Sequence, residues 1–359
     1  MTVAWIGNRD ALVQDAVKHA AELLAASRCP VISIDVDIEG TRAAIALAQR
    51  IGAAYDHPDP GVARETAAFV DAGGIFASPG EVRRRADLVV LVGGLPQEAQ
   101  AFVAELAETT PDLAGANARD FFLVGNGTAF PAGSNVTSTS LTCEGTDLAG
   151  TVAALRARHA GRHTAAPVEN LDQFVDALSG ARFTTFICSG SDAHPLVLEM
   201  MQGLVADLNK KVRASILALP SSEAGWGSTL VSTWTTGFPL RTSFSRGAAE
   251  FDPWRWNVGR MIEEGEADLH LWIAATPGRQ PPPRENIGLI ALTKTDQPVA
   301  DAAVTIPIGE PGEDHDAVMF SNRIGTIAAR KAESSDLPSS ASILKAIAEH
   351  LPAETDSPC

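Results

Sequence analysis

The chain has 359 residues, of which 45% are hydrophobic and 20% are charged, a composition typical of globular proteins. This length is too great for one ordinary core and predicts two domains. The 28 basic and 44 acidic residues give a net charge of −16, which disfavours binding to nucleic acid or to an anionic membrane surface.

The sequence carries no signal for membrane insertion or export. No apolar run approaches the ~20 residues that a membrane span needs, and charged side chains interrupt the first 27 residues. The four cysteines, Cys29, Cys143, Cys188 and Cys359, are far apart and form no CxxC pair. We therefore expect a cytoplasmic protein with reduced thiols, without a zinc ribbon or a cysteine-ligated iron–sulfur cluster.

Strand and helix signals alternate through the first part of the chain. After a short strand at 3–6, Asn8 is expected to cap an amphipathic helix that runs to Ala26. Further strands are expected at 31–34, 88–92 and 121–124, helices at 41–51, 61–72 and 96–106, and a turn at 80–86. This alternation predicts a mostly parallel sheet that is covered on both faces.

A small and basic stretch, 148–167, follows and is interpreted as a connecting helix at a domain boundary. Its basic residues are Arg156, Arg158, His159, Arg162 and His163. His159 and His163 could face the same way on a helix and bind a metal, but such sites need a third ligand and neighbouring arginines repel a cation. An exposed basic linker explains the same residues and is the favoured interpretation.

A second α/β unit is expected after this stretch, with Asn170 capping its first helix. From here to the end of the chain, the expected strands are 183–188, 212–219, 269–274, 287–292 and 303–307, and the later helices are 194–209, 256–264 and 339–351. The stretch 226–247 is rich in Gly, Thr and Ser and is expected to be less regular.

Three glycine-containing turns follow predicted strands and could hold phosphates through backbone amides. Their candidate residues are Gly93, Gly94, Asn126 and Ser189. The chain contains neither GxGxxG nor GxxxxGK[ST], and strand-to-helix turns need glycine for steric reasons alone. Plain turns are therefore the favoured interpretation.

Two further places could carry chemistry. Asp192 and His194, in the sequence SDAHP, could act in acid–base chemistry or contact a ligand, although a helix cap explains them as well and is favoured. Arg241 and Arg246 could clamp an anionic ligand or form salt bridges at an interface. With no GxSxG and no activated cysteine, the residues alone name no reaction.

Several blocks resemble the B subunits of formylmethanofuran dehydrogenases. They are WTTGFP at 234–239 with SFSRG at 243–247, GEV at 80–82 with RADLV at 85–89, GEAD at 265–268, and Gly325-Thr326. Gly93 falls where a strand of that family ends in a glycine turn. The family belongs to the molybdopterin and tungstopterin oxidoreductases, whose members bind two pterin dinucleotides, a metal and an iron–sulfur cluster.

The chain departs from that family where the cofactors bind. The family's cysteine-rich amino-terminal region has no counterpart here, and Ile38 stands where the family has its cysteine or selenocysteine metal ligand. Isoleucine has no lone pair for a metal, and the acidic residues Asp35 and Asp37 are expected to repel pterin phosphates. The resemblance therefore implies no cofactor, no metal and no catalytic residue, but a vestigial cleft. Its candidate residues are Ile38, Gly93, Gly94, Asn126, Ser189, Asp192, His194, Arg241 and Arg246.

The same pattern is similar to the B subunits of the formyltransferase/hydrolase complexes of aerobic methylotrophs. This implies a non-catalytic scaffold subunit in one-carbon metabolism. Its implied partners are a formyltransferase, an amidohydrolase-type hydrolase and a further structural subunit. Together they would transfer a formyl group from a tetrahydromethanopterin-type to a methanofuran-type carrier and hydrolyse it to formate.

The resemblance also implies a fold, namely two doubly wound, Rossmann-like domains with mostly parallel sheets, as in the middle domains of molybdopterin oxidoreductases. The first domain would be discontinuous, 1–155 with 300–359, and the second, 165–299, would be inserted into it. Two alternatives stay open. The chain could still bind a pterin or nucleotide in the interdomain cleft, through the glycine turns with Arg241 and Arg246. It could instead be a small-molecule sensor or carrier.

Overall fold

The computed structural model describes residues 3–95, 97–125, 130, 136–163, 167–189, 195–282, 287–333 and 335–352. The chain divides into two compact units. The first unit is made of Met1–Ala63, Ser222–Phe320 and Ile327–Cys359, and the second of Arg64–Ser221 and Ser321–Thr326. Helix α3 (Pro60–Ala72) contains the first change from one unit to the other.

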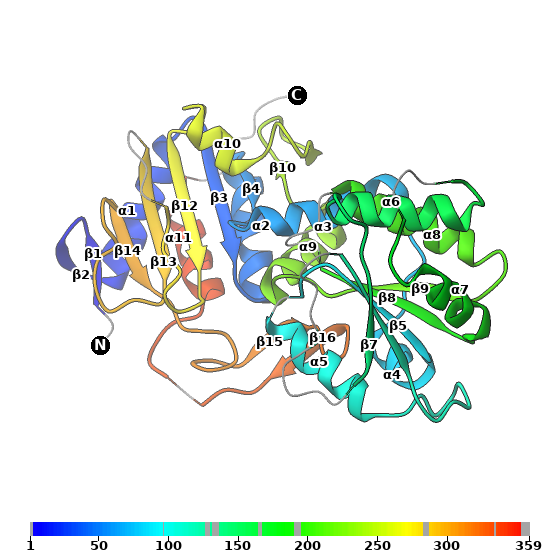
Figure 1. The fold of residues 1–359 in the computed structure, drawn as a ribbon. Helices are drawn as coiled ribbons and strands as arrows, with labels where there is room; N and C mark the ends of the chain where they lie inside the picture. Colours follow the sequence, from blue (N-terminus) through cyan, green and yellow to red (C-terminus); the bar gives the residue numbers. More distant parts are fainter. Residues whose placement is uncertain are drawn as a thin grey trace. The chain divides into compact units, whose positions relative to one another are not determined.

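The described part of the first unit contains a nine-stranded sheet in the order β11-β10-β4-β3-β12-β13-β14-β1-β2 (Figure 1). The five central strands, β4, β3, β12, β13 and β14, are parallel to one another. Antiparallel strands extend the sheet at both edges, β10 and β11 beyond β4, and β1 and β2 beyond β14. The strands are β1 (Val3–Ile6), β2 (Arg9–Leu12), β3 (Pro30–Asp35), β4 (Ala54–Asp56), β10 (Thr242–Ser243), β11 (Glu250–Phe251), β12 (Leu269–Ala274), β13 (Gly288–Thr293) and β14 (Val304–Pro307).

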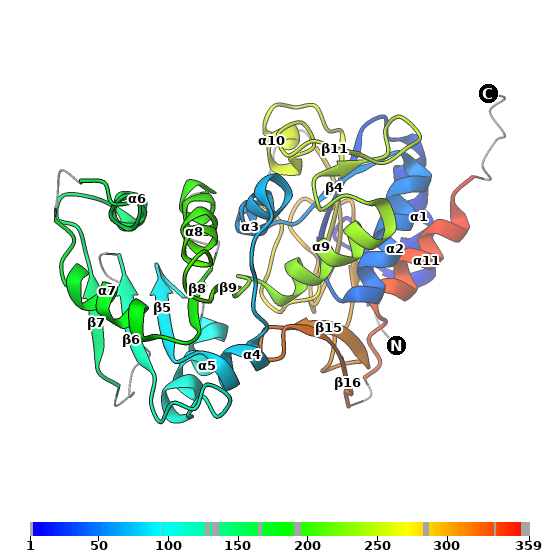
Figure 2. The ribbon, with the colours of Figure 1, turned by 90° about the vertical axis from the view of Figure 1, so that its right-hand side faces the viewer.

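Helices cover the two faces of this sheet unequally. Along β3, Ile32 and Ile34 enter the main core, whereas Val31 enters a second cluster on the opposite face, because successive side chains of a strand alternate. The helices of the main-core face are α1 (Val13–Ala26), α2 (Ile38–Ile51), α9 (Glu223–Thr236) and α11 (Ser340–His350), with α2 beside α11 (Figure 2). The second cluster lies under the short helix α10 (Val258–Glu263).

Two expectations for this unit are wrong. The predicted helix from Asn8 to Ala26 starts only at Val13, because Gly7 takes a left-handed conformation (φ +57°) and turns the chain into the β1–β2 hairpin. The sequence predicts an irregular stretch at 226–247, but this stretch contains most of helix α9, which Gly237 ends. The hydroxyls of Thr229 and Thr233 bond carbonyls four residues back and so fit within the helix.

In its described part, the second unit contains a five-stranded, wholly parallel sheet in the order β7-β6-β5-β8-β9. The strands are β5 (Leu88–Val92), β6 (Asp120–Val124), β7 (Ser138–Leu141), β8 (Thr184–Cys188) and β9 (Ala214–Ala218). Along β5, Leu88 and Val90 enter one hydrophobic cluster while Val89 and Leu91 enter another, so both faces of the sheet are buried.

Helices lie on both faces of this second sheet (Figure 2). One cluster contains side chains of α6 (Leu148–His159), α7 (Leu171–Gly180) and α8 (Pro195–Leu208), and the other those of α4 (Pro79–Arg85) and α5 (Gln97–Glu108). A separate two-stranded sheet pairs β15 (Ala317–Ser321) with β16 (Thr326–Arg330). No helix in the described part of the chain has the length and apolarity needed to cross a membrane.

The expected first domain is 1–155 with 300–359, and the expected second domain is 165–299. The compact units of the structure begin and end at other residues. Strand pairing explains the difference. The expected bounds place β8 in the second domain and β5 in the first, yet these strands are neighbours in one sheet. Likewise β12 pairs with β3 in the other sheet. Helix α6, expected to connect the domains, packs in the second unit and ends at His159, so His159 and His163 do not share a helix face.

Candidate functional site

A cluster of buried ionisable side chains lies at the carboxyl ends of β3 and β4, where parallel sheets commonly place ligands. Asp35 is the last residue of β3, and Asp56 is the last residue of β4, with His57 directly after it. The side chains of His57 and Asp35 are 0% and 1% exposed. Ionised groups buried to this degree need partners, since desolvation of an unpaired charge is costly.

Asp35 has two such partners. His57 Nε2 lies 3.1 Å from Asp35 Oδ1, and Arg279 Nη1 donates to Oδ2 at 2.6 Å. Burial raises the pKa of Asp35, but the hydrogen bond from His57 and the charge and hydrogen bond of Arg279 outweigh it and hold the pKa below its usual value. The carboxylate is therefore stable in its ionised form.

The neighbouring backbone fixes the tautomer of His57. The amide of Asp59 donates to His57 Nδ1 at 2.9 Å, so Nδ1 carries no proton and Nε2 is the donor toward Asp35. Both ring nitrogens of a neutral imidazole are thus occupied. In this arrangement His57 has a positioning role and is available neither as a general base nor as a metal ligand.

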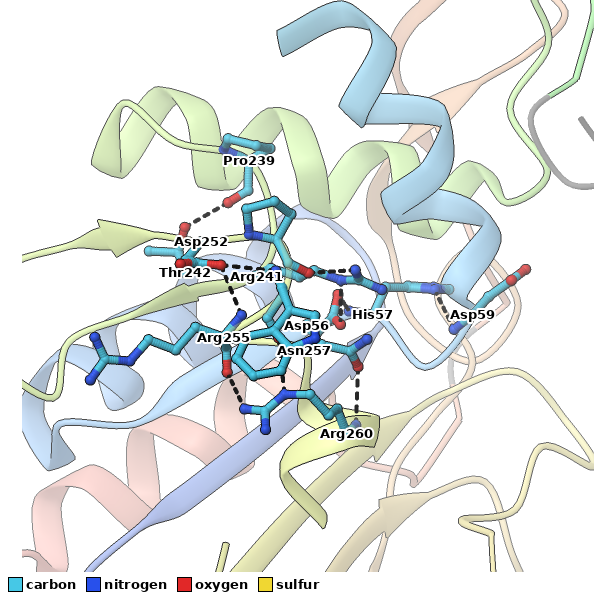
Figure 3. Close-up of polar contacts among 12 residues, drawn as sticks. Asp56, His57, Asp59, Pro239, Arg241, Thr242, Asp252, Arg255, Asn257 and Arg260 are labelled. Atoms are coloured by element: carbon cyan, nitrogen blue, oxygen red, sulfur yellow. Dashed lines mark hydrogen bonds and ion pairs between the residues drawn. The ribbon is translucent and has the colours of Figure 1, made fainter. Parts of the chain in front are cut away.

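Asp56 forms a second ion pair beside the first. Its Oδ2 accepts from Arg241 Nε at 3.1 Å, and its Oδ1 accepts from the His57 amide at 2.8 Å (Figure 3). Burial raises the pKa of Asp56 even though the charge of Arg241 opposes this change. Arg241 has φ +66° and also donates to the carbonyl of Pro253, so it is fixed in place.

A cavity of about 360 Å³ opens beside this cluster, between α10 and the sheet. Asp56 and Arg241 line it together with His270 and Trp272 of β12 and Ser33 of β3. His270 Nε2 lies 2.9 Å from Ser33 Oγ, and in the described part of the chain the buried Trp272 Nε1 has no hydrogen-bond partner. Trp272 thus lines the cavity, while its indole Nε1 is a buried donor without a partner among the described residues.

The residues around Ile38 do not fit a metal centre. Ile38 is the first residue of α2, is 7% exposed, and belongs to the main core. The Cδ1 atom of Ile38 lies 3.3 Å from where a Cβ on Gly227 would be. An aliphatic side chain packed in this way offers no lone pair. Within the described ranges, no three His, Cys, Asp or Glu side chains come together to hold a metal ion.

The expected repulsion of phosphates by Asp35 and Asp37 is wrong for Asp35, because its charge is compensated by Arg279. Asp37 caps α2, since its Oδ1 accepts from the amide of Gly40 at 3.0 Å. Burial raises the pKa of Asp37, although the hydrogen bond from Gly40 opposes the change. The acidic turn thus serves the fold of the chain.

The glycine turns of the second unit lie at neighbouring strand ends. Gly93 and Gly94 follow β5 and Ser189 follows β8, and these two strands pair. Gly93 has φ +71°, and a Cβ there would lie 2.9 Å from Leu148 Cδ2, which is a steric reason for glycine. Ser189 Oγ donates to Glu65 Oε1 at 3.3 Å. The structure therefore brings Gly93, Gly94 and Ser189 to the carboxyl ends of two neighbouring strands.

The remaining candidates are not joined in one site. Arg246 Nη1 pairs with Glu250 at 3.2 Å on the surface, whereas Arg241 pairs with the buried Asp56. The two arginines thus form separate salt bridges, each within the first unit and not with one another's partner. The candidates Asn126, Asp192 and His194 lie outside the described residues.

The main polar residues of the first unit cannot be recognised from the sequence alone. His57 and Arg279 are not among the candidates, although Asp56-His57 directly after a strand end is a usable signal. Arg279 lies far from Asp35 along the chain, and no local pattern links the two. Trp272 lies within a strand, where an aromatic residue first suggests core packing.

Comparison with known proteins gives a match over almost the whole chain. No family model matches. The chain is 32% identical over 338 residues, 93% of this chain and 91% of the relative, to the Fhc B subunit of the formyltransferase/hydrolase complex of Methylorubrum extorquens. A shorter match, 29% identical over 110 residues, covers 29% of this chain and 25% of the B subunit of tungsten-containing formylmethanofuran dehydrogenase 2 of Methanocaldococcus jannaschii.

A solved structure agrees with these relatives. The fold superposes with a TM-score of 0.87 and 30% identity on a chain of the crystal structure of the formyltransferase/hydrolase complex FhcABCD from Methylorubrum extorquens in complex with methylofuran. The match covers 96% of this chain and 98% of that one. The chain therefore belongs to the family of B subunits of the formyltransferase/hydrolase complex.

Proposed function

We propose that this chain is a non-catalytic structural subunit of a formyltransferase/hydrolase complex in one-carbon metabolism. In that complex a formyl group passes from a tetrahydromethanopterin-type carrier to a methanofuran-type carrier and is hydrolysed to formate. The partners of the chain are a formyltransferase, an amidohydrolase-type hydrolase and a further structural subunit, in the cytoplasm.

The observation that carries this proposal is the extent of the match to a chain of FhcABCD, which covers 96% of this chain at a TM-score of 0.87. The match includes both compact units and is not limited to one pocket. A similarity that extends over the whole fold supports the same kind of role, as one subunit of a multi-subunit complex.

Two features of the first unit support a subunit without redox chemistry of its own. The position that the resemblance aligns with a metal ligand is Ile38, buried in the main core. The ring nitrogens of His57 are both occupied by Asp35 and Asp59. We propose on this basis that pterin, metal and iron–sulfur cluster have all been lost, and that the candidate residues are vestiges of the positions that once contacted them.

Affinity purification of the tagged full-length chain from its native host tests the proposal. We expect stoichiometric formyltransferase and amidohydrolase-type subunits in the eluate, identified by mass. Elemental analysis should give neither molybdenum nor tungsten, and pterin fluorescence after oxidation should be absent. A chain that is purified alone, without partner subunits, would overturn the structural role.

The same eluate tests the alternative that the chain still binds a pterin or nucleotide. The cavity beside Asp56, with the buried donor Trp272 Nε1, is the observation that favours this alternative. A stoichiometric pterin or nucleotide would then be released on denaturation. Its loss in the Trp272→Phe variant, with the partners retained, would assign it to this cavity.

The finer fold assignment belongs to the same proposal. We infer that the two compact units are degenerate, doubly wound domains of the kind found in the middle of molybdopterin oxidoreductases. The strand order of the wholly parallel sheet, which reverses direction between β5 and β8, supports this relation. The insertion of the second unit into the first, seen in the chain order, supports it as well.

A further inference from the structure

A groove of about 270 Å³ lies between helices α6, α7 and α8 of the second unit and is called here the α6–α8 groove. Its apolar wall is formed by Leu155, Phe174, Leu178, Leu204 and Leu208, each less than 9% exposed. At its edge Val175 of α7 is 48% exposed, although it is a large apolar side chain. The groove thus offers an apolar surface to solvent.

The charged residues that line this groove all have one sign. They are Arg158 at the end of α6 and Lys211 after α8, with the imidazole of His159 beside them, and no carboxylate is among the described residues of the lining. This is unusual for a chain with 44 acidic and 28 basic residues. The basic stretch found in the sequence therefore lies along an apolar groove, which an exposed linker does not require.

Two of the three basic groups, Arg158 and Lys211, are not neutralised by a carboxylate in the described part of the chain, whereas His159 lies within electrostatic reach of Asp207. Neither Arg158 nor Lys211 forms a salt bridge there, whereas the adjacent Lys210 pairs with Asp207 at 2.7 Å. A carboxylate brought to the groove would therefore meet cations that are not already neutralised. Charge-assisted hydrogen bonds of this type are strong and directional, above all for arginine.

The dimensions favour a polypeptide over a small molecule. Small-molecule pockets usually measure roughly 300–1,000 Å³, so about 270 Å³ suits one or two large apolar side chains. A second, more polar hollow of about 610 Å³ adjoins the groove, shares Arg158 and Leu171 with it, and is lined by both His163 and the carboxylate of Asp172. Together the two hollows form a surface longer than a single side chain.

We infer that the α6–α8 groove receives an acidic, amphipathic segment of a partner subunit. One large apolar side chain of the segment enters the groove, while its carboxylates pair with Arg158 and Lys211. This pairing follows the mode by which amphipathic segments bind apolar grooves with charged rims. The inference rests on the proposed function, because it needs a complex in which partner subunits are present.

Zero-length cross-linking of the purified complex tests the contact directly. A carbodiimide joins an amine to a carboxylate only when the two touch, so Lys211 should form an amide with an Asp or Glu of a partner subunit. The Lys211→Arg variant keeps the charge but removes the amine and should abolish this cross-link. The matched control Lys210→Arg should retain it. A cross-linked peptide without a large apolar residue near the joined carboxylate would overturn the inference.

Charge reversal tests the energetic role of the groove. The double variant Arg158→Glu with Lys211→Glu should reduce the partner subunits that co-purify with the tagged chain at least tenfold. Val175→Glu, at an exposed position that tolerates polar side chains, should act in the same direction. The control Lys210→Glu, beside the groove, should leave the yield unchanged. Far-UV circular dichroism of each variant verifies that it is folded.

The outcomes separate this inference from the proposed function. If the wild-type chain brings down no partner subunits, the proposed function fails. If the complex forms but all groove variants assemble like wild type, only the groove inference fails. A small anionic amphiphile that native mass spectrometry finds on the wild-type chain, and not on the double variant, would also refute a polypeptide occupant.

Discussion

The buried pair of Asp35 and Arg279 allows a quantitative prediction for the Arg279→Gln variant. The variant removes the cation whose Nη1 lies 2.6 Å from Asp35 Oδ2 but retains the contact between the carboxylate and His57. The Asp35 side chain is 1% exposed, so water cannot replace the lost partner. We expect the ionised carboxylate to become a source of instability in the first unit.

The size of the effect follows from burial. Removing one partner of a buried ion pair typically costs ~3–5 kcal/mol, because the other charge stays desolvated. Arg279 is 32% exposed and His57 still donates to Asp35, so we expect a smaller cost, about 2–3 kcal/mol. With a urea m-value of roughly 2–3 kcal/mol/M, the unfolding midpoint should fall by about 1 M.

Tryptophan fluorescence is a selective assay for this effect. All six tryptophans and the one tyrosine lie in the first unit, so the emission reports unfolding of that unit alone. The control is Arg246→Gln, whose salt bridge with Glu250 has side chains that are 59% and 34% exposed. Exposed pairs of this type contribute roughly 0–1 kcal/mol, so the control should shift the midpoint by a few tenths of a molar at most.

The pH dependence gives the result that would refute this reasoning. The folded-state pKa of Asp35 lies below its usual value, so its pairing stabilises the fold above the unfolded-state pKa of about 4 and is lost as the pH falls through the folded value. In the variant the pKa should rise, since Arg279 no longer lowers it. The destabilisation should therefore be largest at neutral pH and shrink toward pH 4. A midpoint like that of the control, or a deficit independent of pH, would contradict the assigned role.

Three further predictions follow from the packing. Gly225→Ala places a Cβ 2.5 Å from Val62 Cγ2, so overpacking should cost about 1–3 kcal/mol in urea unfolding, and an unchanged midpoint would contradict the close contact. Burial, and to a smaller extent the charge of Glu65, raises the pKa of the Cys188 thiol to about 12. This thiol should therefore react with iodoacetamide at pH 8 only after unfolding, and rapid labelling of the native protein, detected by mass spectrometry, would refute this. Ile38→Ala should cost about 2–4 kcal/mol by cavity formation, and a stability equal to wild type would remove Ile38 from the core.

Local patterns in the sequence are sufficient for many of the elements. The apolar runs 88–92 and 121–124 are strands β5 and β6, and the stretch that follows 31–34 is helix α2. These segments are short, strongly apolar or clearly periodic, so their neighbours matter little. Local patterns do not predict helix α9, because its many Gly, Ser and Thr residues have low helix propensity. The sequence pattern does not show that its hydroxyls bond within the helix.

The domain bounds and the polar cluster cannot be read in this way, because both depend on residues distant along the chain. Strand β3 pairs with β12, and Asp35 forms an ion pair with Arg279. In both cases the partners are separated by more than half of the sequence. Periodicity describes one element at a time and gives no partner for it. The resemblance to a known family supplies the inserted arrangement, but the positions of the insertion follow from strand pairing alone.

The order in which the chain leaves the ribosome has a consequence for its biogenesis. The second unit is almost contiguous, Arg64–Ser221, and its parallel sheet is complete once β9 has emerged. The first unit begins earlier but cannot close, because β3 lacks its neighbour β12 until much later. Domains generally fold as units during synthesis, so the inserted unit should fold first. Until β12 is synthesised, β3 and β4 lack part of their sheet and keep apolar side chains exposed. We expect the nascent chain to need chaperones most in this interval, because apolar surface is then exposed.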